Sequence, residues 1–204
     1  AYQQLAYDGG KPETAGLTGL LPSENTARVV SESCARCHGW DGQGRQGAFP
    51  MLAGQQAEYL YASLHAYAQG KRHSGTMEAV VVGLSADTLR ELADYYARLP
   101  RAVAVQAEAL DAAAVARGAA IAQQGIPAQH VPACVACHGS GTEPRNPVYP
   151  KLAGQPADYL ELQLQLFQGQ RRGGTAYAHL MRVPAAGLTA EQRRDVASYF
   201  SSLP

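Results

Sequence analysis

Large aliphatic side chains are scarce in this chain of 204 residues. Leucine, isoleucine, valine and phenylalanine together number 38, with only two isoleucines, whereas alanine alone contributes 37. A share below about one fifth marks a thin hydrophobic core. Disorder is not expected, because disordered chains combine low hydrophobicity with high net charge, and the 17 basic and 17 acidic residues here cancel. The composition therefore predicts a folded chain whose side chains alone do not fill its interior.

Long hydrophobic runs and clusters of one charge are also missing. The best apolar run, 79–84, is far shorter than the roughly 18 residues of a membrane span. A formal charge of zero without a Lys/Arg cluster argues against a nucleic-acid partner, because phosphate binding depends on cations. The chain starts at Ala1 and not at Met, so we expect an exported, mature protein whose signal peptide has been removed.

An internal duplication organises the chain. The segment CARCHG at 34–39 recurs as CVACHG at 134–139, and PMLAGQ at 50–55 recurs as PKLAGQ at 150–155. The C-terminal parts of the two halves match at a slightly larger offset, so the second half carries a small insertion. A repeat this long is a domain and not a solenoid unit. We predict two homologous domains, 1–100 and 101–204, with residues 1–22 as an extended N-terminal arm.

The periodicity within each domain is helical, and we predict an all-α fold. The last helix of each domain is expected to begin after an N-cap residue, Ser85 or Thr189, and Gln192 completes a capping box with Thr189. Further helices are expected at 24–33 and 107–123. A central helix in each domain has apolar residues at helical spacing. These residues are Leu60, Leu64 and Tyr67 in the first domain and Leu160, Leu164 and Phe167 in the second.

All four cysteines lie in two C-x-x-C-H motifs, for which several chemistries compete. A disulfide within the motif closes a tiny loop and stabilises little. Zinc needs four ligands in one site, and each motif offers three. A thioredoxin-like redox pair needs a βαβ unit, which a helical chain lacks. The remaining interpretation is covalent haem attachment, because two thiols one helical turn apart match two porphyrin vinyl groups and the next His can reach the iron.

The duplicated motif therefore predicts two covalently bound haem c groups. The second axial ligand of each iron decides between electron transfer and catalysis. Met77 and Met181 occupy equivalent places, whereas Met51 is replaced by lysine in the second domain, so we predict Met77 and Met181 as distal ligands. The nearby His73 and His179 have no histidine counterparts and are interpreted as surface or neighbouring residues. The predicted attachment and proximal residues are Cys34, Cys37 and His38 in the first domain and Cys134, Cys137 and His138 in the second.

A proline follows each proximal histidine by twelve residues. The carbonyl groups of Pro50 and Pro150 can accept a hydrogen bond from the imidazole Nδ1, which would orient the ring. Leu52 and Leu152 are expected to contact the porphyrin face. Four further residues are equally compatible with propionate contacts and with ordinary packing or surface positions. They are Tyr59, Tyr159, Arg45 and Trp40.

From about residue 26 to 204 the chain resembles the dihaem cytochromes c of the cytochrome c4 family. The resemblance is carried by both C-x-x-C-H-G motifs, by the P-x-L-A-G-Q segment after each, and by the terminal helices that end in Leu-Pro. It implies two tandem class I cytochrome c-like domains, His and Met ligands at each iron, and a periplasmic location with peripheral membrane association. It also implies redox partners such as a membrane oxidase, a bc1-type complex or a periplasmic dehydrogenase.

We expect an electron carrier and not an enzyme. A thioether ligand favours the ferrous state, and a filled sixth position leaves no place for a substrate on the iron. Two alternatives stay open. One is a cytochrome subunit of a dehydrogenase that acts on sulfide, thiosulfate or a similar compound, and the other is a dihaem enzyme in which one iron ligand is labile.

Overall fold

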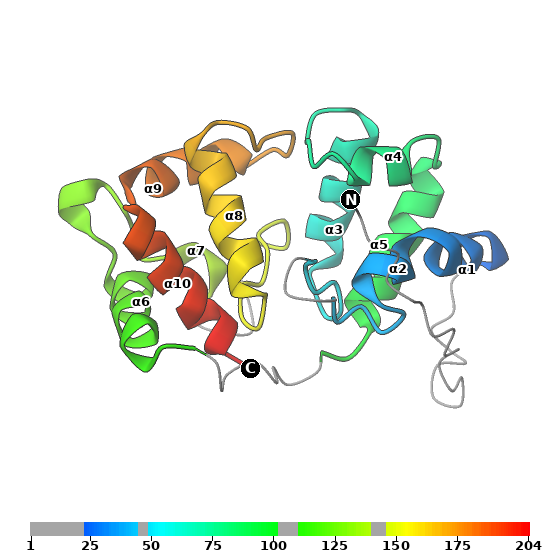
Figure 1. Cartoon of the computed structure of the whole chain (residues 1–204). Coiled ribbons are helices and arrows are strands. Elements are labelled where there is room, and N and C mark those ends of the chain that lie inside the picture. Colours follow the sequence, from blue (N-terminus) through cyan, green and yellow to red (C-terminus); the bar gives the residue numbers. More distant parts are fainter. Residues whose placement is uncertain (1–22, 45–48, 102–109, 140–145) are drawn as a thin grey trace, which may run out of the picture.

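Two helical lobes, one from each half of the chain, lie side by side (Figure 1). The computed structural model describes residues 23–44, 49–101, 110–139 and 146–204. Within these residues the backbone is helical apart from turns, loops and one isolated bridge between Ile126 and Val131, so the predicted all-α class is confirmed. The proposed arm at 1–22 and Arg45 lie outside the described residues. Part of the segment after the predicted domain boundary, 102–109, does so too, and the boundary stays a prediction.

The first domain begins with one helical run that leads into the first cysteine motif. It consists of α1 (Glu24–Val29), the π-helical turn η2 (Val30–Cys34) and α2 (Ala35–His38). The helix predicted at 24–33 is therefore present and continues to the proximal histidine. The domain is completed by α3 (Ala57–Ala68), α4 (Met77–Val81) and α5 (Ala86–Arg98), and α5 packs against both α1 and α3.

The second domain repeats this arrangement. Its elements are α6 (Ala112–Gln124), η4 (Pro127–Gln129), α7 (Val135–His138), α8 (Ala157–Gln168), η5 (Ala178–Met181), α9 (Arg182–Gly187) and α10 (Ala190–Ser202). Helix α10 packs against α6 and α8. The helix predicted at 107–123 begins only at Ala112, because the carboxylate of Asp111 accepts the Ala113 N–H at 2.9 Å and caps it there. Residues 107–109 of that prediction lie outside the described residues.

The last helix of each domain starts where its cap predicts. Ser85 Oγ accepts the Thr88 N–H at 3.1 Å, and Thr189 forms the expected reciprocal capping box with Gln192. These caps set the register in which each helix buries one face. The buried faces carry Leu92, Tyr96 and Leu99 in α5 and its C-terminal cap, and Val196 and Phe200 in α10.

The two domains are joined by a reciprocal set of hydrogen bonds. Gln55 donates to the Lys151 carbonyl at 3.0 Å and accepts the Lys151 N–H at 2.8 Å. Gln155 does the same with Met51, at 2.8 Å and 3.0 Å. Both glutamines end a P-x-L-A-G-Q segment, so each domain uses the same position in the same way. The contact has the self-complementary character of a two-fold interface.

Close packing of α6 on α10 depends on Gly118. A Cβ at this position would overlap the backbone carbonyl of Asp195 and crowd the Cβ of Tyr199 at 2.9 Å. We expect Gly118→Ala to lower the free energy of unfolding by about 1–3 kcal/mol, the cost of overpacking a fitted contact. Denaturant unfolding of the holoprotein measures this. Gly173→Ala is the matched control, since nothing lies within 4 Å of its Cβ position, and equal stability of both variants would contradict the prediction.

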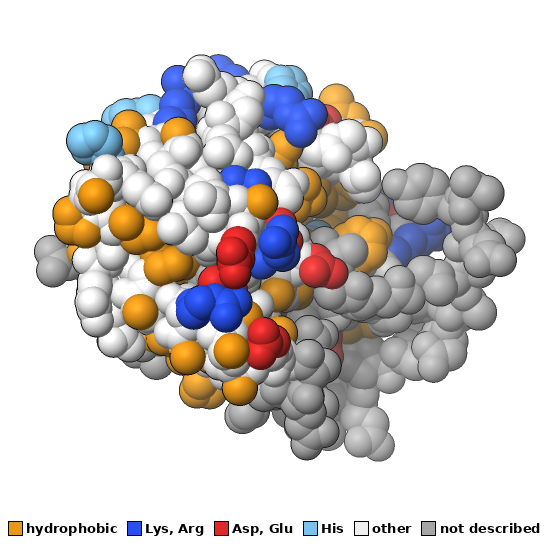
Figure 2. All heavy atoms as spheres, turned by 60° about the vertical axis from the view of Figure 1, so that its left-hand side comes forward, with side chains coloured by type: hydrophobic (Ala, Val, Ile, Leu, Met, Phe, Trp, Pro, Cys, Tyr) orange, Lys and Arg blue, Asp and Glu red, His pale blue; other side chains and the backbone are white. Residues whose placement is uncertain are grey.

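The face shown in Figure 2 has mixed charges at its middle and mainly Lys, Arg and His side chains along its upper edge. Acidic and basic side chains lie together near the middle of that face, with hydrophobic side chains scattered around them. Mixed charges of this kind provide little long-range steering of a partner.

Candidate functional site

An apolar cavity of about 660 Å³ runs through both domains. Its walls come from α3, α5 and the Met77 region in the first domain, and from α8, α10 and the Met181 region in the second. It brings together all the residues that the sequence assigned to the two haem sites. These are Cys34, Cys37, His38, Pro50, Leu52 and Met77, and Cys134, Cys137, His138, Pro150, Leu152 and Met181.

The local fold explains how each cysteine motif presents its groups. One helical turn spans each motif, with the His138 N–H donating to the Cys134 carbonyl at 3.0 Å in the second domain. The glycine after each histidine has a left-handed backbone, with φ of 78° at Gly39 and 77° at Gly139. A glycine adopts this conformation without steric cost, so the chain turns away directly after the histidine.

Both histidine rings are held in one orientation. Nδ1 of His38 lies 3.0 Å from the Pro50 carbonyl oxygen, and Nδ1 of His138 lies 2.9 Å from that of Pro150. A carbonyl oxygen only accepts, so Nδ1 carries the proton and donates, and the lone pair of Nε2 is left free. Burial lowers the pKa of both histidines, while the proline carbonyls act in the opposite direction. A neutral imidazole with a free Nε2 is the form that binds a metal.

The cysteine sulfurs fit thioether bonds. All four cysteines are free of disulfides. Burial raises the pKa of Cys34 and of Cys134 to about 11. These thiols are therefore uncharged in the apolar wall, where a neutral thioether is also tolerated.

The three methionines differ in their surroundings. Met77 begins α4 and Met181 ends η5, and both line the cavity. Met51 also touches the cavity, but it belongs to the first-domain core and its N–H is used by Gln155. The nearby His73 and His179 are both exposed, so no described feature brings them into the cavity.

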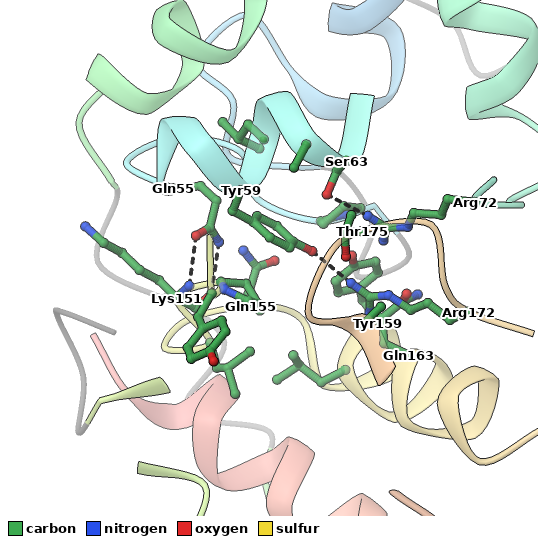
Figure 3. Close-up of a pocket in the computed structure, with 18 of the residues that line it drawn as sticks. Gln55, Tyr59, Ser63, Arg72, Lys151, Gln155, Tyr159, Gln163, Arg172 and Thr175 are labelled. Atoms are coloured by element: carbon green, nitrogen blue, oxygen red, sulfur yellow. Dashed lines mark hydrogen bonds between the residues drawn. The ribbon is translucent and has the colours of Figure 1, made fainter. Parts of the chain in front are cut away.

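Two arginines that the sequence reasoning missed lie where the domains meet, Arg72 buried and Arg172 half-buried (Figure 3). Arg172 donates to the Tyr59 hydroxyl of the other domain at 2.9 Å, and Arg72, only 4% exposed, donates to Ser63 Oγ at 2.8 Å. Among the described residues neither has a carboxylate within ion-pair distance. Burial would raise the pKa of Tyr59, but Arg172 and Arg72 outweigh it and lower that pKa.

The buried guanidinium group of Arg72 needs an anionic partner, and the half-buried Arg172 lies beside it. The donor set of the cavity as a whole fits haem: two sulfurs, one neutral imidazole and one thioether in each domain, with cations that match propionate carboxylates. The recurrence of arginine at 72 and 172, at the 100-residue offset, is the signal that could have identified these residues. Tyr59 and Tyr159 are both half-buried beside them and line the cavity, whereas Trp40 packs on the first-domain core.

Comparison with known proteins agrees with this chemistry. The family model described as cytochrome c matches residues 23–95 and again 115–204. Cytochrome c4 of Pseudomonas aeruginosa is 33% identical over 194 residues, covering 93% of this chain and 94% of that protein. The thiosulfate dehydrogenase electron acceptor of Thiomonas intermedia is 34% identical over 173 residues, covering 84% and 79%.

The fold agrees as well. The crystal structure of reduced recombinant cytochrome c4 from Pseudomonas stutzeri matches with a TM-score of 0.79 and 29% identity, over 88% of this chain and 96% of that one. The prediction of two tandem cytochrome c-like domains is thereby confirmed. The chain belongs to the cytochrome c family, as a dihaem cytochrome of the c4 type with two covalently bound haem c groups.

Proposed function

We propose that this dihaem electron-transfer cytochrome accepts single electrons from a periplasmic dehydrogenase of an inorganic sulfur compound and passes them to a membrane oxidase or reductase. The observation that carries the proposal is the matched lining of the cavity, with a histidine and a methionine in each domain. The relative described as a thiosulfate dehydrogenase electron acceptor supports this class of donor. A bc1-type complex is an alternative partner.

In this proposal a histidine and a methionine of the chain would be the protein ligands of each iron, which would leave no free coordination site. Nε2 of His38 and of His138 is oriented by the Nδ1 bonds to the proline carbonyls, and the thioethers of Met77 and Met181 would be the second protein ligand in each domain. Leu52 and Leu152 line the cavity and would cover the porphyrin faces and exclude water. The bound haem supplies one-electron chemistry, and a thioether ligand favours its ferrous form.

The interface keeps the two redox centres at a fixed separation. The bonds of Gln55 and Gln155 tie the loop after each haem motif to the same loop of the other domain. We therefore expect the two haems to exchange electrons within the chain, and their reduction to be described by two potentials that belong to the pair.

Optical spectroscopy separates the carrier from a dihaem enzyme with one labile ligand. We expect the oxidised holoprotein to show the far-red sulfur-to-iron charge-transfer band at the intensity of two haems, because both irons carry a thioether. The reduced protein should not bind carbon monoxide on the time scale of mixing. Half the intensity, or rapid carbon monoxide binding at one haem, would favour the enzyme.

A reconstituted reaction tests the donor. We expect stopped-flow mixing of the oxidised holoprotein with thiosulfate to leave it oxidised, and addition of a catalytic amount of a thiosulfate dehydrogenase to reduce both haems. Reduction by thiosulfate alone would identify the chain as an enzyme. If the dehydrogenase does not reduce the cytochrome and a bc1-type complex does, the proposed donor is wrong and the bc1-type complex takes its place.

The remaining parts of the proposal concern location and organisation. Among the described residues no helix is both long and apolar enough to cross a membrane. We propose a periplasmic protein in which 1–100 and 101–204 are the two domains, each with one haem.

A further inference from the structure

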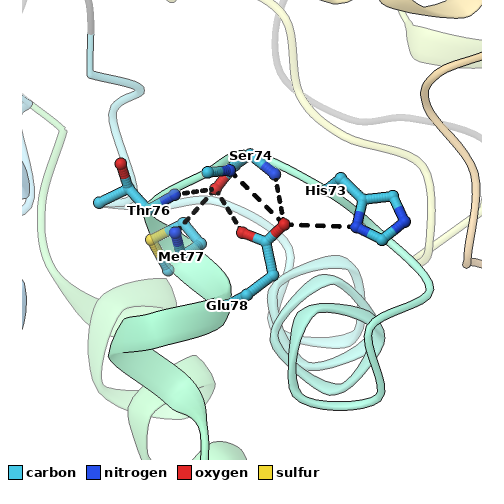
Figure 4. A network of polar contacts seen from close by, with 6 residues as sticks. His73, Ser74, Thr76, Met77 and Glu78 are labelled. Atoms are coloured by element: carbon cyan, nitrogen blue, oxygen red, sulfur yellow. Dashed lines mark hydrogen bonds and ion pairs between the residues drawn. The ribbon is translucent and has the colours of Figure 1, made fainter.

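The loop in front of Met77 is closed by hydrogen bonds to one side chain (Figure 4). Ser74 Oγ accepts the Met77 N–H at 2.7 Å and the Thr76 N–H at 3.1 Å. The N–H groups of the N-cap and of the first residue of α4 thus both donate to a single hydroxyl oxygen. Helix α4 has only five residues, Met77–Val81, and a helix of that length has little stability of its own.

The carboxylate of Glu78 fixes the orientation of that hydroxyl. Ser74 Oγ donates to Glu78 Oε2 at 2.9 Å, and the Ser74 N–H donates to Oε1 at 2.7 Å. With its proton directed to Glu78, the hydroxyl presents its lone pairs to the N–H groups of Met77 and Thr76. His73 lies at the edge, its Nδ1 3.5 Å from Glu78 Oε1, and is largely exposed. We call this arrangement of Ser74 and Glu78 the Met77 clamp.

The described residues around Met181 include no counterpart of the clamp. The residue three positions before Met181 is Ala178, and the residue after Met181 is Arg182. Ala178 has no side-chain acceptor, and it forms an apolar cluster with Phe167 and Ala185 against which Met181 packs. The two domains therefore differ in how the chain at the methionine is held. The start of α4 at Met77 is fixed by polar contacts in a largely exposed loop, with Val81 buried at the other end of the helix, whereas Met181 itself packs on an apolar cluster.

We propose that the Met77 clamp is a positioning device that keeps the Met77 thioether turned into the cavity, and that Met181 needs no such device. The inference rests on the proposed role of Met77 as an iron ligand. Ser74 and Glu78 act through the backbone of Met77 and not on the haem. Loss of the clamp should free the start of α4 and increase the fraction of molecules in which the thioether has left the iron.

Binding of an external ligand measures that fraction. Imidazole occupies the sixth position only when the methionine has left, so its apparent dissociation constant equals the intrinsic constant divided by the open fraction. Removal of a hydroxyl that accepts from the N-terminal N–H groups of a helix changes such an equilibrium by about fivefold. Ser74→Ala should therefore raise the imidazole affinity of the first-domain haem by about fivefold and leave the second unchanged.

The experiment is an imidazole titration of the oxidised holoprotein, followed through loss of the charge-transfer band. Ser74→Ala is compared with Ser74→Thr, which keeps the hydroxyl and should restore the original affinity. Glu78→Ala should act in the same direction as Ser74→Ala. The matched control is Ser85→Ala, which removes a cap of the same type from α5, where Ser85 accepts from Thr88. It should lower thermal stability without changing imidazole binding.

Met77→Ala, measured in parallel, distinguishes failure of the clamp from failure of the assignment of Met77 as an iron ligand. If it removes half of the band while Ser74→Ala binds imidazole like the original protein, the clamp is refuted and the ligand assignment stands. If Met77→Ala leaves the band intact, the ligand assignment itself fails. An equal shift at both haems in Ser74→Ala, or an equal shift in Ser85→Ala, would also overturn the clamp, because either would reflect general loss of stability.

Discussion

Met77→Ala and Met181→Ala are each expected to remove half of the charge-transfer absorbance and to lower one of the two reduction potentials. Axial ligands set haem potentials over a range of about 0.8 V, and we expect a decrease of a few tenths of a volt when a thioether is lost. Spectroelectrochemical titration of each holoprotein variant measures both quantities. The double variant should lose the band completely.

Met51→Ala is the control for these variants. Met51 is 7% exposed and lies in the first-domain core, so its truncation should cost about 2–5 kcal/mol of unfolding free energy. It should leave both halves of the absorbance and both potentials close to their original values. A loss of half the band in Met51→Ala, with Met77→Ala unchanged, would show that the pairing of the two repeats around the methionines is wrong.

A chain with all four cysteines replaced by alanine is expected not to reach a rigid native fold. Without attached haem groups, nothing occupies the cavity of about 660 Å³. At about 24 cal/mol per Å³ of cavity the cost approaches 16 kcal/mol as an upper value, or about 8 kcal/mol for each of the two domains, which is comparable to the usual 5–15 kcal/mol of domain stability. Far-UV circular dichroism should show reduced helix content, and amide hydrogen exchange should show little protection.

The double variant Cys134→Ala, Cys137→Ala is the matched comparison. It should attach one haem per chain, as counted by a pyridine haemochrome assay, and should keep slow amide exchange in the first domain. A cooperative unfolding transition of native size in the four-cysteine variant would contradict the account, because the side chains would then fill the interior unaided.

The main features of the fold could be predicted because the sequence is duplicated, so each motif occurs at equivalent positions in both halves. The matching C-x-x-C-H-G and P-x-L-A-G-Q segments identify equivalent positions, and the caps at Ser85 and Thr189 are local features that need no tertiary information. The shortage of large aliphatic residues also has its counterpart in the cavity. The start of α6 was misplaced because alanine-rich sequence favours helix on both sides of Asp111, and only the cap fixes the boundary.

The contacts between domains could not be predicted in the same way. Arg72 and Arg172 look like surface residues in a Gly-rich loop, but Arg72 is buried, and Arg172 is half-buried and bonded to Tyr59 of the other domain. The Met77 clamp depends on the course of the loop from Ser74 to Glu78, for which the sequence offers no periodicity. Both features arise from tertiary packing, which overrides local preference.

The reciprocal glutamine bonds have a consequence for how such a chain can arise. Each domain carries both the glutamine side chain and the backbone N–H and carbonyl groups that the glutamine of the other domain binds. Two separate copies of one such domain would therefore be complementary to each other about a two-fold axis. Joining the copies in one polypeptide replaces a concentration-dependent dimer by an intramolecular pair with a high effective concentration. Each copy is then free to change alone, and the different ways in which Met77 and Met181 are held exemplify such divergence.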